Sequence, residues 1–395
     1  MTVNYISQAV QPQGTNPSPE TVSNESTPKL FTPITCKSVT LHNRIVVPPM
    51  CMYSCTDGFF NDFHVAHYGS FALKRPGMII IEATGVEARG RISPHDAGLW
   101  SDDHIAPLKR VVDIIKSQGS VPSIQIAHAG RKANMGSSWT TGYINVPETD
   151  GGWPNNVIGP SEARFDDQHA DVQVLGVPQL KEVAQKWADA AVRAHQAGIE
   201  VLEIHSAHGY LLHNFLSAHS NHRTDQYGGS LQNRLRFPLE VVQAVRDVWP
   251  QEKPLWVRFS ASDCKNPDPQ SHDEEGWDVY QAIEYAKALK AIGVDVIDVS
   301  SGGNRSDVNY VVGKLYQVPF SKAVKHEAGI PTGAVGLIIE PKDAEEILQK
   351  DEADYILVGR EHLRDPAWTN RAAAELGIRI EWVNQYQRAN TRIRK

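Results

Sequence analysis

The chain has 395 residues, a formal net charge of −7, and 41% hydrophobic residues. This composition is that of a globular protein, and the length is enough for one large barrel domain with a sizeable core. The 39 Lys and Arg residues form no basic stripe, and no apolar run approaches membrane-spanning length. We therefore expect neither nucleic acid nor a membrane as a partner. The N-terminus lacks the apolar core of a signal peptide, which predicts a cytoplasmic protein.

The four cysteines predict reduced thiols. Cys36, Cys51, Cys55 and Cys264 lack the paired spacing of a zinc ribbon or an iron–sulfur cluster. They are also too few to form a disulfide framework for a chain of this size. We expect no bound metal.

Composition divides the chain into three parts. Residues 1–30 are rich in Pro, Ser, Thr, Asn and Gln, and bury too little apolar surface to offset the entropy of ordering, so they predict a flexible tail. Residues 31–380 carry the apolar patterning of one domain, and residues 381–395 form a C-terminal tail.

Short apolar runs alternate with amphipathic segments through that domain. The expected strands are residues 44–49, 78–83, 122–127, 199–205, 255–260, 294–300, 332–336 and 355–359. Helices expected between them include residues 183–197, 231–248, 279–291 and 342–350. Eight apolar strands separated by helices indicate a parallel sheet covered on its outer face, and a (β/α)₈ TIM barrel fits best.

A doubly wound sheet is the alternative fold. Dinucleotide-binding versions of it carry a G-x-G-x-x-G motif after the first strand, and this chain has none there. Residues 134–177, rich in Gly, Pro and Asp, interrupt the third unit and predict a long loop over the pocket.

The most informative segment is residues 203–210 (EIHSAHGY), at the end of the fourth strand. It sets His205, His208 and Tyr210 where side chains turn into a common pocket, and barrels place their chemistry at these strand ends. The two imidazoles can bind a developing negative charge on a substrate oxygen, as an oxyanion hole does. Tyr210 is a candidate general acid. A lone His or Tyr is more often a core or rim residue, but three together favour catalysis.

The last two strands predict a phosphate site. Gly336 and Gly359 end the seventh and eighth strands, where barrels commonly bind phosphate through backbone N–H groups, and Arg360 would add a bidentate charge. Either glycine alone is better explained by a tight turn. Their joint position favours a phosphorylated cofactor or substrate.

Several motifs together resemble the Old Yellow Enzyme family. They are, in order, residues 44–53 (RIVVPPMCMY), 125–132 (QIAHAGRK), 203–210, 221–230 (NHRTDQYGGS) with Asn233 and Arg234, and 358–360 (VGR). The resemblance covers about residues 30–390, and Cys51 followed by Tyr53 is similar to its "thermophilic-like" branch.

This resemblance implies a bound FMN and a ping-pong reaction in which hydride passes from NADPH or NADH to FMN and then to the β-carbon of an enone or enal. By position it assigns His205, His208, Tyr53 and Tyr210 to the substrate. It assigns ten residues to FMN: Pro48, Pro49, Met50, Cys51, Ala83, Gln125, Arg258, Gly336, Gly359 and Arg360.

Individual residues have competing explanations. A guanidinium at Arg258 would favour an anionic reduced flavin, or it could form a buried ion pair with Glu203. Gln125 could bond the pyrimidine ring of the flavin or a neighbouring loop. Cys51 could be a small buried apolar residue, but its place after a Pro-Pro-Met turn favours tuning of the flavin potential, not nucleophilic attack.

The resemblance also implies that Arg388 extends into the site of a neighbouring subunit in a homodimer or homotetramer. A solvated basic tail is the alternative, because Ala389 and Asn390 follow in place of an aromatic ending. Two other functions stay open. A metal-dependent hydrolase could use His205, His208, His213 and Glu203 as ligands, and a flavin-free, non-catalytic protein could use the same barrel.

Overall fold

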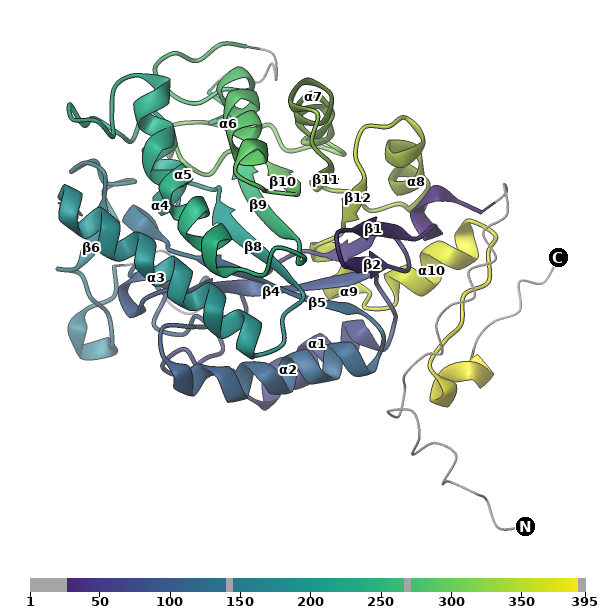
Figure 1. Cartoon of the computed structure of the whole chain (residues 1–395). Helices are drawn as coiled ribbons and strands as arrows, with labels where there is room; N and C mark the ends of the chain where they lie inside the picture. Colours follow the sequence, from purple (N-terminus) through teal and green to yellow (C-terminus); the bar gives the residue numbers. More distant parts are fainter. Residues whose placement is uncertain (1–26, 140–144, 266–270, 390–395) are drawn as a thin grey trace.

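The computed structural model describes residues 27–139, 145–265 and 271–389, and its centre is a closed barrel of eight parallel strands (Figure 1). In chain order the barrel strands are β3 (Ile45–Val47), β4 (Met78–Gly85), β5 (Val121–Ala127), β8 (Val201–Ser206), β9 (Leu255–Ser260), β10 (Val296–Ser300), β11 (Thr332–Ala334) and β12 (Tyr355–Leu357). Pairing of β12 with β3 closes the ring. Each strand falls on one of the eight predicted runs, which confirms the (β/α)₈ barrel.

Helices surround the barrel, so its strands are buried almost throughout. The helices are α1 (Asp62–Ala72), α2 (Ile105–Ser117), α3 (Val177–Gln196), α4 (Leu211–Leu216), α5 (Leu231–Val248), α6 (Val279–Ala291), α7 (Val318–Ala328), α8 (Pro341–Gln349), α9 (Arg360–Arg364) and α10 (Trp368–Glu375). Because both faces of each strand are covered, continuous apolar runs, not alternating ones, mark them in the sequence.

Two predicted helices have the bounds that the sequence indicates. Ser230 caps α5 by accepting the N–H of Asn233, and Asp278 caps α6 by accepting the N–H of Gln281. The predicted helix 342–350 lies one residue off α8. The predicted start at residue 183 was wrong, because α3 begins at Val177, where the Gln179 side chain accepts the N–H of Gly176.

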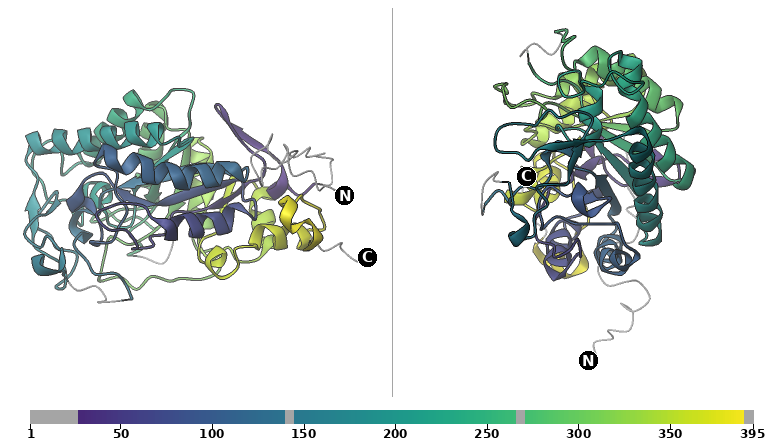
Figure 2. Two further views of the ribbon diagram at one scale, coloured as in Figure 1. Left: turned by 90° about the horizontal axis from the view of Figure 1, so that it is seen from below. Right: turned by 90° about the vertical axis from the view of Figure 1, so that its left-hand side faces the viewer.

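A short hairpin closes the end of the barrel where the strands begin. It consists of β1 (Ile34–Cys36) and β2 (Val39–Leu41), paired antiparallel, and lies at the same end as the last described residues of the chain, drawn in yellow (Figure 2). Its Val39 and Leu41 pack on inward-facing residues of the barrel: Val46, Met78, Ile80, Val201, Trp256, Val296, Tyr355 and Leu357. We call this cluster the apolar plug. It leaves the opposite end, where the strands finish, for chemistry.

Lys29 and Leu30, the last described residues of the predicted tail, contact the barrel domain. The backbone N–H groups of Lys29 and Leu30 both donate to the carboxylate of Glu345 on α8, at 2.8 Å each. Leu30 is fully buried. Leu30, although it follows a polar segment of the sequence, thus belongs to the core. Residues 1–26 of the predicted tail lie outside the described residues.

The predicted loop 134–177 contains regular structure of its own. Strands β6 (Val157–Gly159) and β7 (Val172–Val174) pair in parallel within it, and residues 140–144 are outside the description. In the part of the chain that the structure describes, no helix is long and apolar enough to cross a bilayer.

Candidate functional site

The strand ends enclose a cavity of about 220 Å³ at the open end of the barrel. The residues predicted for FMN that line it are Pro48, Pro49, Met50, Arg258, Gly336, Gly359 and Arg360. His208 also lines it. Loops after β3, β8, β9, β11 and β12 therefore meet at one cavity, as the parallel barrel predicts.

One end of this cavity has the features of an anion site. Gly336 has a φ of +118°, and a Cβ there would lie 2.8 Å from Nε2 of Gln317, so the chain can approach this closely only as glycine. Two guanidinium groups, from Arg360 and Arg364, line the same cavity. A backbone that can closely approach a ligand, together with two cationic side chains, suits a dianionic phosphate.

The same cavity also contains a donor suited to an aromatic carbonyl edge. Arg258 lines the cavity while its Nε lies 3.3 Å from Oδ2 of Asp298, without the geometry of a hydrogen bond. The predicted buried ion pair of Arg258 therefore exists, but Asp298, not Glu203, is the carboxylate in contact. Nε2 of Gln125 donates to Oε1 of Glu203 at 2.8 Å. Candidate phosphate ligands and a further guanidinium in one cavity fit FMN.

His205, His208 and Tyr210 lie together, as their spacing predicts. The ring centroid of His205 is 5.2 Å from that of His208 and 4.8 Å from that of Tyr210. Burial, and then the charge of Arg258, lowers the pKa of both imidazoles well below its usual value. Both rings are therefore neutral at pH 7 and can each donate one hydrogen bond.

The backbone fixes which nitrogen of His205 carries the proton. The N–H of Ala207 donates to Nδ1 of His205 at 3.1 Å, so the proton is on Nε2. Nε2 of His208 lies 2.7 Å from the Ser300 hydroxyl, which itself donates to Gln317. His208 thus also carries its proton on Nε2, and Ser300 accepts it.

Close backbone contact holds His208 in place. Its φ is +59°, in the left-handed region, and its N–H donates to the Ser260 hydroxyl at 3.0 Å. A Cβ at Gly303 would lie 2.6 Å from Cα of His208, so only glycine lets the loop after β10 pack here. The Ser-Ser-Gly-Gly sequence after β10 therefore shapes the histidine loop.

Lys132 is a site residue that the sequence argument quoted without giving it a role. Its Nζ donates to the carbonyl groups of His208 (3.0 Å) and Gly303 (2.9 Å). It also lies 4.4 Å and 5.5 Å from the ring centroids of Phe165 and Tyr210. Burial, and then the neighbouring Arg131, lowers the pKa of Lys132 to about 8. Its place directly after the third strand was the available signal.

Cys51 and Tyr53 lie at the end of β3 and pack, with Tyr210, on one apolar cluster of the excursion after β5. Burial, and then the carboxylates of Asp96 and Glu82, raises the pKa of Cys51 well above its usual value, so the thiol keeps its proton. The backbone of Ala83 bonds this thiol. Tyr53 contacts Trp139 edge-to-face, with ring centroids 5.4 Å apart.

Other lining residues had not been predicted. Tyr316 and Gln317 precede α7, and Leu337, Ile338, Ile339 and Arg364 follow β11 and β12. The signal for the first pair was Pro319, which marks the start of a helix and so places the residues before it at the strand-end face.

Arg388 lies outside this cavity. It is exposed in a short 3₁₀ segment (Asn384–Ala389), whose Tyr386 ring stacks under the ammonium group of Lys74 at 4.4 Å. Lys74 belongs to the α1–β4 connection, at the plugged end of the barrel. Within one chain Arg388 therefore does not face the other site residues.

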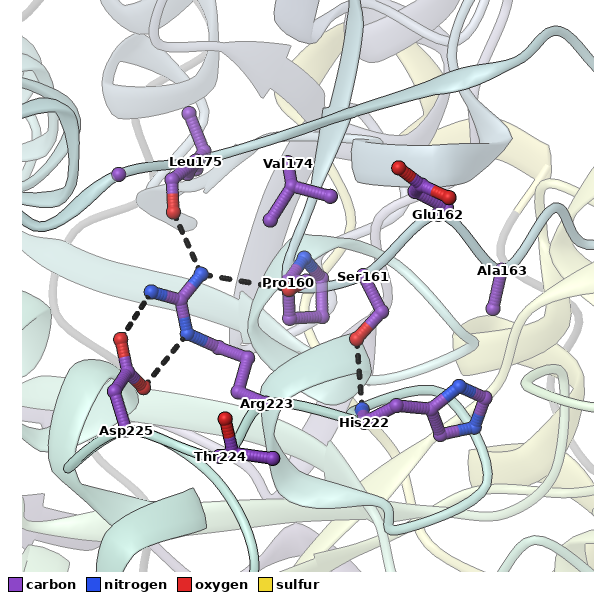
Figure 3. A pocket seen from close by; sticks show the side chains of 11 residues that line it. Pro160, Ser161, Glu162, Ala163, Val174, Leu175, His222, Arg223, Thr224 and Asp225 are labelled. Carbon is purple, nitrogen blue, oxygen red and sulfur yellow. Dashed lines mark hydrogen bonds and ion pairs between the residues drawn. The ribbon is translucent and has the colours of Figure 1, made fainter.

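The NHRTDQYGGS motif, residues 221–230, contacts the long segment between β5 and α3 (Figure 3). Arg223 forms an ion pair with Asp225 and donates to the carbonyl groups of Leu175 (2.6 Å) and Pro160 (3.4 Å). The N–H of His222 donates to the Ser161 hydroxyl at 2.7 Å. These residues line a second, open cavity of about 550 Å³. The bonds of Arg223 to Leu175 and Pro160 connect the motif to the segment between β5 and α3.

The histidines do not form a metal site. His213 faces Asp263, with 3.1 Å between its Nε2 and Oδ1, and its Nδ1 accepts the N–H of Gly209. Within residues 27–139, 145–265 and 271–389, no three His, Cys, Asp or Glu side chains are grouped to hold a metal.

Comparison with known proteins now places the chain. Residues 29–378 match the NADH:flavin oxidoreductase / NADH oxidase family. The chain is 46% identical to the NADPH dehydrogenase of Bacillus velezensis over 364 residues, covering 91% of this chain and 99% of the relative. It is also 46% identical to that of Bacillus subtilis over 363 residues, covering 91% and 98%.

Solved structures agree in fold. A morphinone reductase superposes with a TM-score of 0.72 at 24% identity, covering 91% of this chain and 92% of the other. An old yellow enzyme homologue from Zymomonas mobilis gives 0.70 at 22%, covering 91% and 96%. The family match and the two NADPH dehydrogenases decide against the metal-dependent hydrolase and the flavin-free barrel. The chain therefore belongs to the NADH:flavin oxidoreductase / NADH oxidase family, that of Old Yellow Enzyme, and is an FMN-dependent oxidoreductase that uses NAD(P)H.

Proposed function

We propose that the protein is an ene-reductase that reduces the C=C bond of α,β-unsaturated ketones and aldehydes. The observation that carries this proposal is the grouping of His205, His208 and Tyr210 beside the cavity, with ring centroids 4.8 and 5.2 Å apart. Two neutral donors and one phenol match a reaction in which charge grows on a carbonyl oxygen and a carbon atom takes up a proton. The relatives in solved structures include, by its name, a reductase of morphinone.

FMN held in this cavity would supply the redox chemistry, a ping-pong transfer of hydride from NAD(P)H to the β-carbon of the substrate. Nε2–H of His205 donates to the substrate carbonyl oxygen. Nε2–H of His208 donates to the same oxygen once that oxygen displaces the Ser300 hydroxyl. As charge builds on the oxygen, these donors stabilise it more strongly than they stabilise the neutral carbonyl, which lowers the barrier. Tyr210 delivers a proton to the α-carbon, and Tyr53, which packs against the same apolar cluster as Tyr210, borders the substrate.

The remaining residues bind and adjust the cofactor. Arg360, Gly336 and Gly359 would hold the phosphate of FMN, and Arg258 would bind the flavin ring. Pro48, Pro49, Met50, Ala83 and Gln125 complete its surroundings. Cys51 keeps its thiol proton, so it acts on the flavin potential through a weak hydrogen bond and not as a nucleophile.

Replacing Tyr210 by Phe tests the proposal. We expect flavin reduction by NADPH to keep its rate, while reoxidation by 2-cyclohexenone slows by roughly 10²-fold or more, the usual contribution of a general acid. Anaerobic stopped-flow absorbance at the flavin band measures the two steps separately. Tyr280→Phe, on the outer helix α6, is the matched control and should leave both rates unchanged. Equal reoxidation rates in Tyr210→Phe and wild type would remove Tyr210 from the mechanism. If no enone reoxidises the reduced wild-type flavin, the proposal as a whole is wrong.

We also propose that Arg388 completes the substrate site of a second copy in a homodimer or homotetramer. Its exposure at the plugged end, outside its own cavity, supports a role in another chain over one in its own. Arg388→Ala should then raise KM for the enone without changing the rate of flavin reduction. A monomer in sedimentation with full activity would exclude this shared site. The cytoplasmic location stays a prediction from composition.

A further inference from the structure

A layer of four polar side chains separates the apolar plug from the cavity. It consists of Gln125 on β5, Glu203 on β8, Arg258 on β9 and Asp298 on β10. Gln125 is the register partner of Glu203, and Asp298 is the register partner of Arg258. Glu203 and Asp298 are fully buried, and Gln125 and Arg258 are 2% and 7% exposed. Such a layer inside a barrel is costly unless its charges are balanced.

The charges in this layer do not balance if both carboxyl groups are ionised. One guanidinium would then face two carboxylates, and two like charges in a buried site cannot both persist at low cost. Glu203 receives one hydrogen bond, from Gln125 to its Oε1. Its Oε2 and both oxygens of Asp298 have no hydrogen-bond donor among the described residues. The two carboxyl groups are in hydrogen-bonding contact, so one proton held between them joins Oε2 of Glu203 to one oxygen of Asp298.

The surroundings favour a proton on Glu203. Burial, and then the charge of Asp298, raises the pKa of Glu203 well above its usual value. Burial also raises the pKa of Asp298. Arg258 lowers the pKa of both groups, but for Asp298 it is the largest cause after burial and the hydrogen bond from Glu203 acts in the same direction, whereas for Glu203 the charge of Asp298 comes before it. The other groups that face the pair are neutral: the Gln125 amide, and the His205 ring, whose lowered pKa leaves it uncharged at pH 7.

We propose that Glu203 is a neutral carboxylic acid that donates to Asp298, and that the Asp298 carboxylate neutralises and orients Arg258 from the side away from FMN. Glu203 and Asp298 are then positioning residues that act through Arg258. A guanidinium paired with Asp298 raises the midpoint potential of the flavin less than an unpaired one would, because the negative charge of Asp298 partly cancels its positive charge. This inference rests on FMN binding at the cavity but not on which substrate is reduced.

Two substitutions separate the roles. Glu203→Gln imitates the protonated acid, since the amide can still donate to Asp298 and accept from Gln125. Asp298→Asn removes the charge that faces Arg258. We expect the midpoint potential of bound FMN in Glu203→Gln to equal that of wild type. In Asp298→Asn it should rise by at least the equivalent of a tenfold change in the oxidised–reduced equilibrium, about 30 mV for a two-electron couple. Asp247→Asn, on the exposed face of α5, is the control.

A spectroscopic experiment on the FMN-free protein tests the shared proton by itself. At pH 7 the infrared difference spectrum between wild type and Glu203→Gln should contain the C=O stretching band of a protonated carboxylic acid. Its absence would overturn the proposal, whatever the protein reduces. Equal potentials in Asp298→Asn and wild type, or an equal rise in both variants, would overturn it as well. If Asp298→Asn fails to fold, the infrared result and the potential of Glu203→Gln decide the question.

Discussion

Lys132 should assist proton delivery by Tyr210, and Lys132→Met is the perturbation that tests this. The ammonium group lies 5.5 Å from the Tyr210 ring centroid and is held by the carbonyl groups of His208 and Gly303. Met keeps a similar volume and an unbranched stem, so the change removes the charge with little loss of packing. A phenol that gives up its proton develops negative charge, which a nearby cation stabilises.

The distance sets the size of the effect. Two unit charges 5.5 Å apart interact by about 3 kcal/mol at an effective dielectric constant of 20. If roughly half of the charge has developed in the transition state, about 1.5 kcal/mol is lost, which corresponds to a roughly tenfold slower step. The pKa of Lys132 is lowered to about 8, so wild type carries this charge below pH 8 and loses it above. The wild-type rate should therefore fall as the pH rises through about 8.

Stopped-flow reoxidation by 2-cyclohexenone, measured from pH 6 to pH 10, is the assay. We expect Lys132→Met to be about tenfold slower at pH 6.5 and to have lost the decline near pH 8, while flavin reduction by NADPH keeps its rate. Lys109→Met, which removes an exposed charge paired with Asp113, serves as the control. A variant with the wild-type rate and the same decline near pH 8 would refute the role of Lys132.

Two further predictions concern acid stability and cofactor retention. Burial alone would raise the pKa of Glu87, but the hydrogen bond from His128 and the ion pair with Arg89 outweigh it and lower this pKa to about 2. A lowered carboxyl pKa stabilises the fold above the unfolded value near 4.5 and ceases to do so as the pH falls toward 2. Urea unfolding should therefore find Glu87→Gln less stable by about 3 kcal/mol at pH 7 and by less than half of that at pH 3, whereas a difference independent of pH would contradict the linkage. Gly336→Ala should weaken FMN binding at least tenfold in an equilibrium titration, because its Cβ would enter the space beside Gln317, while Gly313→Ala, which meets no atom within 4 Å, should bind FMN like wild type.

The barrel could be predicted because burial on both faces leaves a simple signal. Each strand is a continuous apolar run, and caps such as Ser230 and Asp278 mark helix starts directly. Parallel topology then sends every strand end to one face, so the cavity residues at the strand ends could be predicted, whereas those farther along the loops, such as Tyr316 and Arg364, could not. The resemblance added chemistry to those positions, and the motif with His205 and Tyr210 came together as expected.

What the sequence did not reveal depends on contacts between distant segments. Strands β6 and β7 have three residues each, and most of β7 is exposed, so no periodicity marks them. The role of Lys132 depends on two carbonyl groups brought from other loops. The bond from His208 to Ser300 depends on a packing contact with Gly303. Asp298 took the place predicted for Glu203 as the partner of Arg258, because it is the register neighbour on the next strand.

Strained backbone is more frequent at the open end of the barrel, where the strands finish, than at the plugged end. Non-glycine residues with left-handed backbone on the strand-end loops are Tyr53, Asp57, Asn134, His208, Cys264, Leu315 and Leu337. Those at the opposite end are Lys37, Arg75 and Asp351. Each such residue costs of order 1–3 kcal/mol, so it persists only where the surrounding structure holds it. The apolar plug and the buried strands provide that support without contributing to the chemistry. Tyr53 and His208, which we assign to the substrate, can therefore keep strained conformations that a loop without this scaffold would relax.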